Sequence, residues 1–353
     1  MTLPTLWFVL VALLWTGFFV LEGFDLGVGM LHGVLGRDEP GRRAAINTIG
    51  PLWDGNEVWL VVAAAAMFAA FPAWYATAFS GFYVLVVLLL AALIARGVSF
   101  EFRGKRDSPR WHRTWDVMLT TGSVLVPLSI GLLLGNLLHG VPVNASQEFT
   151  GGLADLLNAY SVFFALAVLV LCVLHGAAFM ALRTTGDLRT RATATARRTA
   201  PLATLAVLVL VVWTHAVAGK GVVPNLLQVA SVLAVVAAWW LLHEGADGWA
   251  FAATSVAMGS TVLSLFADLY PRLLVSSTSP AFDLTVQSSA AGPYALRLVT
   301  IVTLVFLPLV LVYQGWTYYV FRERVRVESF STPHPSAAHA PSVATVPAPR
   351  PRA

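Results

Sequence analysis

The sequence is poor in cysteine and in charged residues. Its 353 residues include a single cysteine, Cys172, and only 11% of them are Asp, Glu, Lys or Arg. One cysteine excludes an intrachain disulfide and a metal site built from cysteines. The low charged fraction accompanies 58% hydrophobic residues and a mean hydropathy of +0.75. This balance excludes a soluble domain of this length and indicates a polytopic membrane protein.

Motifs of several common activities are also missing. The sequence has no Gly-rich phosphate loop, no Cys-His metal spacing and no nucleophile elbow. No Lys or Arg precedes the first apolar run, and this run is longer than a signal peptide requires, so we expect a retained helix. The net charge of +4 comes from basic residues confined to a few segments, which indicates membrane topology rather than nucleic-acid binding.

Apolar runs long enough to cross a bilayer recur along the chain. Crossing a ~30 Å hydrocarbon core takes about 20 apolar residues in a helix. The runs that meet this test are 6–31, 49–71, 75–94, 115–138, 158–182, 201–218, 226–242, 249–270 and 294–321. We therefore predict an all-α polytopic membrane domain over 1–328 with nine transmembrane helices. The remaining segment, 329–353, is rich in Pro, Ala, Ser and Thr, which predicts a disordered tail.

Basic residues predict the orientation of these helices. With the N-terminus outside, 19 of the 22 Lys and Arg residues fall on the inner side. They are Arg37, Arg42, Arg43, Arg96, Arg103, Lys105, Arg106, Arg110, Arg113, Arg183, Arg189, Arg191, Arg197, Arg198, Arg322, Arg324, Arg326, Arg350 and Arg352. Lys220, Arg272 and Arg297 fall outside. This bias predicts a cytoplasmic C-terminus, and the residues from Arg189 to Arg198 form a basic inner loop in this interpretation.

Two acidic pairs lie within apolar surroundings in the first two predicted helices. Glu22 and Asp25 are three residues apart, as are Asp54 and Glu57, so each pair shares a helix face. A charge in hydrocarbon costs at least ~2.5 kcal/mol, so acidic residues there are presumed functional. No basic residue lies within the first helix to neutralise its pair. We interpret the two pairs as parts of a route for protons.

Each pair also has a structural alternative. Glu22 and Asp25 could pair with a buried arginine or cap a neighbouring backbone. Pro51 suits the first turn of a helix, so Asp54 could simply complement the positive end of that helix dipole.

Several neighbouring residues extend this interpretation. Trp53 and Asn56 add hydrogen-bonding groups to the second pair, and Arg96 ends the third helix. Glu101 is a candidate for taking up protons from the cytoplasm. For Arg103 and Asp116 we predict a salt-bridged rim instead.

Two histidines raise the question of haem. His175 and His215 lie in apolar segments, where each could in principle ligate iron. We favour hydrogen-bonded packing groups, because lone histidines in membrane helices more often serve that purpose.

Four stretches of sequence together resemble subunit II of the cytochrome bd quinol oxidases. They are LEGFDLGVGM at 21–30, GPLWDGNEVWL at 50–60, FP with AFSGFY between 71 and 83, and GNLL with GVP between 135 and 142. The likeness continues through 183–191 and into the ninth predicted helix. It therefore covers nearly all of the chain except the tail, and the motif at 50–60 is specific to that family.

The resemblance implies a fold and a division of labour. The family fold is two four-helix bundles plus one additional helix, here about 6–138, 158–270 and 294–321. The oxidase oxidises quinol and reduces oxygen to water in the bacterial plasma membrane, with protons from the cytoplasm. Haems b and d and the quinol site belong to subunit I. Subunit II, the chain that this sequence resembles, then holds no cofactor, metal or catalytic residue and contributes to the proton path.

The resemblance also carries roles for particular residues. Asp25 and Asp54 match the aspartates that the family carries in its first and second helices, and Glu101 stands where relatives carry an acidic residue. Family members often have Gln where this chain has Glu57. We therefore predict a proton pathway of Asp25, Asp54, Glu22, Glu57 and Glu101, supported by Trp53, Asn56 and Arg96.

Other interpretations and partners stay open at this point. A proton-coupled secondary transporter is the main alternative; it predicts inverted repeats and broken helices, which we do not find in the sequence. A haem-bearing subunit would need a long outer loop, whereas the longest outer connections, near 139–157 and 271–293, are short. The sequence leaves open whether the complex holds a structural quinone or lipid, or small single-helix accessory subunits.

Overall fold

The computed structural model describes residues 2–218 and 221–330, so most of the predicted disordered tail lies outside the described residues. Helices dominate the described part. They are α1 (Leu3–Leu35), α2 (Glu39–Asn47), α3 (Trp53–Ala70), α4 (Pro72–Gly81), α5 (Tyr83–Phe102), α6 (Pro109–His139), α7 (Ala159–Arg183), α8 (Gly186–Val217), α9 (Val222–His243), α10 (Asp247–Leu269) and α11 (Pro293–Val320). Strands β1 (Arg272–Leu274) and β2 (Leu284–Thr285) pair antiparallel, with Arg272 opposite Thr285. The predicted all-α class is confirmed.

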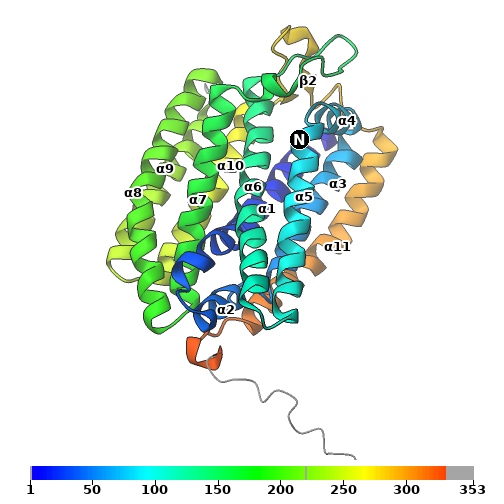
Figure 1. The fold of residues 1–353 in the computed structure, drawn as a ribbon. Helices are drawn as coiled ribbons and strands as arrows, with labels where there is room; N and C mark the ends of the chain where they lie inside the picture. The colour runs from blue at the N-terminus through cyan, green and yellow to red at the C-terminus, as the bar shows by residue number, and fades with distance from the viewer. Residues whose placement is uncertain (1, 219–220, 331–353) are drawn as a thin grey trace, which may run out of the picture.

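The long helices run side by side between two ends of the molecule (Figure 1). The upper end in that view carries the N-terminus, α4 and β2, and the lower end carries α2 and the end of α11. Helices α7 to α10 lie on one side, and α3, α5 and α11 on the other, with α1 and α6 between them. Helix α1 contacts α3, α6, α7 and α10. It is apolar for most of its length and packs against neighbours on several sides, as expected for a helix without one polar face.

Glycines allow α1 and α7 to cross at very short distance. A Cβ atom at Gly27 would lie 2.0 Å from the carbonyl oxygen of Cys172 and 2.7 Å from the Cα of Gly176. A Cβ at Gly176 would in turn lie 2.5 Å from the Cα of Gly27. Small residues at a helix crossing permit this backbone contact. The pair therefore joins the two sides of the molecule close to the acidic pair of α1.

Two of the predicted helices differ most from the observed ones. The predicted helix 75–94 is divided, because α4 ends at Gly81 and α5 begins at Tyr83 and continues to Phe102. The predicted start at residue 201 is also too late, since α8 begins at Gly186 and continues through Pro201. Its first turns are rich in Ala and Arg, which are good helix formers, so the predicted basic loop is helical.

Arginines of the lower end bind the last carbonyl groups of other helices. Arg191 Nε donates to Leu35 O at 2.8 Å, and Arg197 Nε donates to Leu242 O at 2.9 Å. Arg183 donates to Phe321 O. These bonds satisfy carbonyls that a helix end leaves without an intrahelical partner, and they place positive charge at the negative end of the helix dipole.

Eight of the described helices are long and apolar enough to cross a membrane. They include α1, α6, α7, α8, α9, α10 and α11, and the span of α5 extends to Lys105. The remaining predicted segment corresponds to α3, which has 18 residues and carries Asp54, Asn56 and Glu57 near its beginning. These polar residues lower its hydropathy. The predicted count of nine therefore stays a prediction.

Candidate functional site

Helix α1 buries an acidic pair in the middle of the protein. Neither Glu22 nor Asp25 exposes any surface, and both lie among apolar residues of α1. Because α1 continues to Leu35, Asp25 lies ten residues, about 15 Å, from the lower end of the helix. This is deeper than the sequence indicated, since the predicted helix ended at residue 31. Ionised groups at such a depth need partners.

Arg96 of α5 provides the positive charge for this pair. Its Nη1 atom lies 2.7 Å from Glu22 Oε1 and 3.2 Å from Glu57 Oε2, so it links carboxylates of α1 and α3. The guanidinium is itself fully buried. The structural alternative for Glu22, pairing with a buried arginine, is therefore confirmed, although the arginine comes from another helix.

Aromatic rings hold the guanidinium of Arg96 in place. Arg96 lies over the ring of Phe100 at 5.2 Å, and Phe100 stacks on Trp53 at 4.8 Å. Cation–π contacts of this kind favour the planar guanidinium group. Trp53 therefore lies one aromatic ring away from Arg96.

Asn56 of α3 connects Asp25 to α11. Its Nδ2 donates to Asp25 Oδ2 at 2.7 Å and to Leu21 O at 3.2 Å. Its Oδ1 accepts from Gln314 Nε2 at 2.8 Å and from Tyr318 OH at 2.9 Å. Asn56 is fully buried, and all four of its amide contacts are to other helices. No motif in the sequence points to Gln314 or Tyr318.

The buried site holds more acid than base. Glu22, Asp25 and Glu57 face one guanidinium, that of Arg96, within the described part of the chain. Asp25 Oδ1, Glu22 Oε2, Arg96 Nε and Arg96 Nη2 are buried without a hydrogen-bond partner among the described residues. One cation cannot compensate three carboxylates, so protons or water must satisfy the remainder. A site of this composition can take up and release protons.

The other predicted carboxylates lie toward the surface. Asp54 is exposed in the first turn of α3, and Glu101 is exposed near the end of α5. Neither makes an ion pair with the described residues. The order of burial is therefore Asp54, then Glu57, then the fully buried Glu22 and Asp25.

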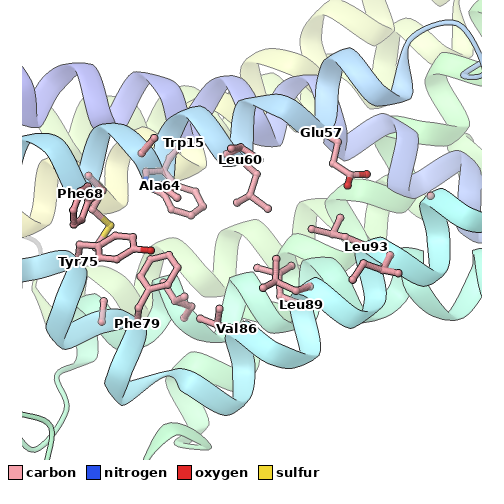
Figure 2. Close-up of a pocket in the computed structure, with 18 of the residues that line it drawn as sticks. Trp15, Glu57, Leu60, Ala64, Phe68, Tyr75, Phe79, Val86, Leu89 and Leu93 are labelled. Atoms are coloured by element: carbon pink, nitrogen blue, oxygen red, sulfur yellow. The ribbon is translucent and has the colours of Figure 1, made fainter. Parts of the chain in front are cut away.

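An apolar groove of about 700 Å³ runs between α3 and α5. Asp54 and Glu57 line one end of it, and Phe68, Tyr75 and Phe79 line the other. Figure 2 shows the Glu57 carboxylate pointing from α3 across the groove toward α5, beside Leu93. Glu57 therefore joins the open groove to the buried cluster around Arg96.

The predicted salt-bridged rim is present below this cluster. Arg103 Nε lies 2.6 Å from Asp116 Oδ1, and its Nη atoms bind both carboxylate oxygens of Glu39 at 2.8 and 2.9 Å. His32 of α1 also joins the rim. Its Nε2 lies 3.2 Å from Asp116 Oδ1, and its Nδ1 is 2.8 Å from Gly29 O.

His175 is a hydrogen-bonded packing group, as predicted. Its Nδ1 lies 2.7 Å from Thr254 Oγ1, its Nε2 lies 3.0 Å from Val20 O, and its ring stacks on Phe251 at 4.7 Å. Both ring nitrogens are occupied, so neither is free for iron. His215 is exposed on α8. The described residues contain no group of three or more His, Cys, Asp or Glu that could hold a metal ion.

Comparisons with known proteins identify the family. The model of the cytochrome bd terminal oxidase subunit II family matches residues 3–321. The chain is 43% identical over 328 residues to cytochrome bd ubiquinol oxidase subunit 2 of Bacillus subtilis, covering 92% of this chain and 97% of the relative. It is 35% identical over 361 residues to cytochrome bd-I ubiquinol oxidase subunit 2 of Escherichia coli K12, covering 92% and 95%.

A solved structure shares the fold. A chain of the bd oxidase from Geobacillus thermodenitrificans superimposes with a TM-score of 0.72 at 19% identity, covering 91% of this chain and 97% of the other. The family match covers almost all of the helical part of the chain, including both acidic pairs. This chain belongs to the cytochrome bd terminal oxidase subunit II family.

Proposed function

We propose that this chain is the haem-free subunit II of a bacterial cytochrome bd quinol oxidase and conducts cytoplasmic protons toward the oxygen-reduction site. The relatives from Bacillus subtilis and Escherichia coli are named as ubiquinol oxidase subunits, which supports quinol as the substrate of the complex. Haems b and d belong to subunit I in this proposal. The family assignment does not favour a proton-coupled transporter.

The acid-rich cluster around Arg96 carries the proposal. A structural ion pair needs one carboxylate for each guanidinium, whereas here Glu22, Asp25 and Glu57 gather near a single one. Burying a charge pair is often no better for stability than burying apolar groups, so a structural role alone does not explain the extra acids. Ionisable groups buried in a membrane protein are functional by default.

The proposed route begins at the lower end of the molecule. Basic residues of α2, α6 and α8 gather at this end, which supports a cytoplasmic location, whereas Arg272 and Arg297 lie at the upper end. Protons then reach exposed Asp54, pass Glu57 and arrive at Glu22 and Asp25. Glu101 is a further group for proton uptake at the same end.

Oxygen reduction consumes protons, and in this proposal the acidic cluster supplies them. Each electron delivered to a buried haem needs a proton nearby, because uncompensated charge in a medium of low dielectric is costly. A proton drawn from the cytoplasm across part of the membrane does electrical work, at ~2.3 kcal/mol per 100 mV for a full crossing. The subunit thereby supports charge separation by the complex.

The topology completes the proposal. Helices α1, α3, α5 and α6 form one four-helix bundle, α7 to α10 form the second, and α11 is the additional helix. All nine span the membrane, with the N-terminus outside and the C-terminus in the cytoplasm. The groove between α3 and α5 is the place on this chain for subunit I, a structural quinone or a lipid. The exposed apolar face of α11 leaves room for a single-helix accessory subunit.

The test is oxygen consumption by the purified complex with quinol as electron donor. We expect Asp54→Asn to slow turnover while the haem spectrum stays normal, because an amide has the size of the carboxyl group but does not carry a proton. Asp187→Asn is the matched control, since Asp187 is exposed at the start of α8, away from the cluster. Wild-type turnover in Asp54→Asn would reject the proton route.

A further inference from the structure

The last turns of α11 carry two polar side chains whose positions the proton route alone does not explain. Gln314 and Tyr318 are one turn apart on this helix, and both donate to Asn56 Oδ1. Elsewhere α11 exposes most of its apolar side chains, and Leu296 is its one buried residue. Helix α11 thus has little buried apolar surface, yet two of its few polar side chains bind Asn56 of the acidic cluster.

The amide of Asn56 has only one orientation that satisfies its neighbours. Leu21 O is a backbone carbonyl, which accepts hydrogen bonds and never donates them, and it lies 3.2 Å from Nδ2. The amide nitrogen must therefore face Leu21 and Asp25. The oxygen faces α11, where Gln314 and Tyr318 supply two donors. An amide reversed by rotation would place its oxygen against the Leu21 carbonyl.

This orientation distinguishes the two oxygens of Asp25. Oδ2 accepts the Asn56 N–H at 2.7 Å, and a protonated oxygen accepts less strongly than an ionised one, so this bond disfavours a proton on Oδ2. Oδ1 is buried and receives no hydrogen bond from a donor group among the described residues, and the Asp25 and Glu22 carboxyl groups are within hydrogen-bonding range of each other. Glu22 lies on the same face of α1, three residues before Asp25. Oδ1 is thus the oxygen of Asp25 that is better placed to carry an exchangeable proton.

We infer that Gln314 and Tyr318 are positioning residues for the proton route: through Asn56 they direct Asp25 to carry its proton on Oδ1. Neither residue carries a proton along the route itself. A second contact fixes α11 for this purpose, since Trp7 Nε1 of α1 donates to Thr300 Oγ1 at 2.9 Å. The inference deepens the proposed function and rests on it.

Infrared difference spectroscopy of the whole complex tests the inference. The C=O stretching band of protonated Asp25 is assigned by its loss in Asp25→Asn, and its frequency reports the hydrogen bonds of that carboxyl group. Removing both α11 donors, as in Gln314→Leu/Tyr318→Phe, leaves Asn56 Oδ1 without its two hydrogen bonds, so the amide is held only from the side of α1. We expect the Asp25 band to shift and quinol-driven oxygen consumption to fall, with an unchanged haem spectrum.

Control variants distinguish the positioning of Asp25 from a general disturbance of α11. Tyr313→Phe makes the same chemical change as Tyr318→Phe on the same helix, at a side chain that is 61% exposed. Its band and turnover should match wild type. Tyr318→Phe is nearly isosteric and should assemble even where the double variant does not; it should give a smaller band shift in the same direction.

An unshifted Asp25 band in both Tyr318→Phe and the double variant would overturn the inference. The proposed function fails in a different way, through wild-type turnover in Asp25→Asn and Asp54→Asn. A band shift in the double variant together with wild-type turnover in Asp25→Asn would overturn the positioning role for catalysis, because Asp25 would then not lie on the route.

Discussion

Arg96 and Glu22 form an ion pair with 2.7 Å between Nη1 and Oε1, and neither side chain exposes any surface. The pair joins α5, which lines the groove, to α1, which carries Glu22 and Asp25, so it holds the acidic cluster beside the groove. Removing one member of a buried pair leaves the other charge without compensation, which typically costs about 3–5 kcal/mol. The first prediction concerns this pair.

Replacing Arg96 should destabilise the assembled complex strongly. We expect Arg96→Met to lower the thermal unfolding midpoint and to reduce the amount of intact complex, because Glu22 and Glu57 lose their shared cation. Arg113→Met is the control, since Arg113 is exposed on α6. The double variant Glu22→Gln/Arg96→Met should be more stable than Arg96→Met alone. Equal stability of Arg96→Met and Arg113→Met would contradict the prediction.

Turnover should fall more in Asp25→Asn than in Glu101→Gln. Asp25 is fully buried beside Asn56, whereas Glu101 is exposed and water can bypass it to reach Asp54. Initial rates of quinol-driven oxygen consumption, normalised to haem content, make the comparison. A larger loss in Glu101→Gln would mean that uptake at Glu101 limits the route and that Asp54 has no independent access to water.

The sequence indicated most of the long helices, the burial of Glu22 and Asp25 and the salt-bridged rim, but not the break between α4 and α5. The features that it indicated depend on local patterns: apolar runs, a three-residue spacing and charges next to helix ends. It also indicated Asn56 and Arg96, which lie beside Asp25 and Glu22, and their supporting roles stay predictions. It did not reveal that Arg96 pairs with Glu22 on another helix, because the pairing of helices is not a local property of the chain.

The contribution of α11 could not have been predicted in the same way. Gln314 and Tyr318 lie 258 and 262 residues from Asn56 in sequence, and nothing near them resembles a site motif. The start of α8 was missed for a different reason. Its first turns carry many Arg residues, and Pro201 follows them, a pattern that is typical of a cytoplasmic loop. Only the structure shows that Arg191 and Arg197 bind carbonyl groups at the ends of other helices.

The crossing of α1 and α7 should not tolerate a methyl group. A Cβ at Gly27 would lie 2.0 Å from Cys172 O, and backbone atoms cannot move aside as side chains do. Overpacking of this kind costs about 1–3 kcal/mol or more, so we expect Gly27→Ala to lower the unfolding midpoint of the complex. Gly33→Ala on the same helix is the control, because no atom lies within 4 Å of its Cβ position. Similar midpoints for the two variants would show that the helices separate easily.

Arg197 should stabilise the lower end of α9. Its bonds to Leu242 O and, at 3.4 Å, to His243 O satisfy carbonyls of the last turn, and a hydrogen bond from a charged group contributes about 1.5–3 kcal/mol. We expect Arg197→Gln to increase hydrogen exchange of the amides between Leu242 and Asp247, measured by mass spectrometry. Arg198→Gln is the control, because Arg198 is the next residue of α8 and is exposed. Equal exchange in both variants would contradict a capping role.

The chain expressed without its partner should show no Soret absorption. Both nitrogens of His175 are held by Thr254 and Val20, at 2.7 and 3.0 Å, and releasing either would leave a buried polar group without a partner. His215 is exposed, so it offers no enclosed pocket for a haem. Absorption spectra of the purified subunit, with the intact complex as positive control, make the test. A stoichiometric haem signal that disappears in His175→Ala would assign an iron ligand to this chain and end the proposed division of labour with subunit I.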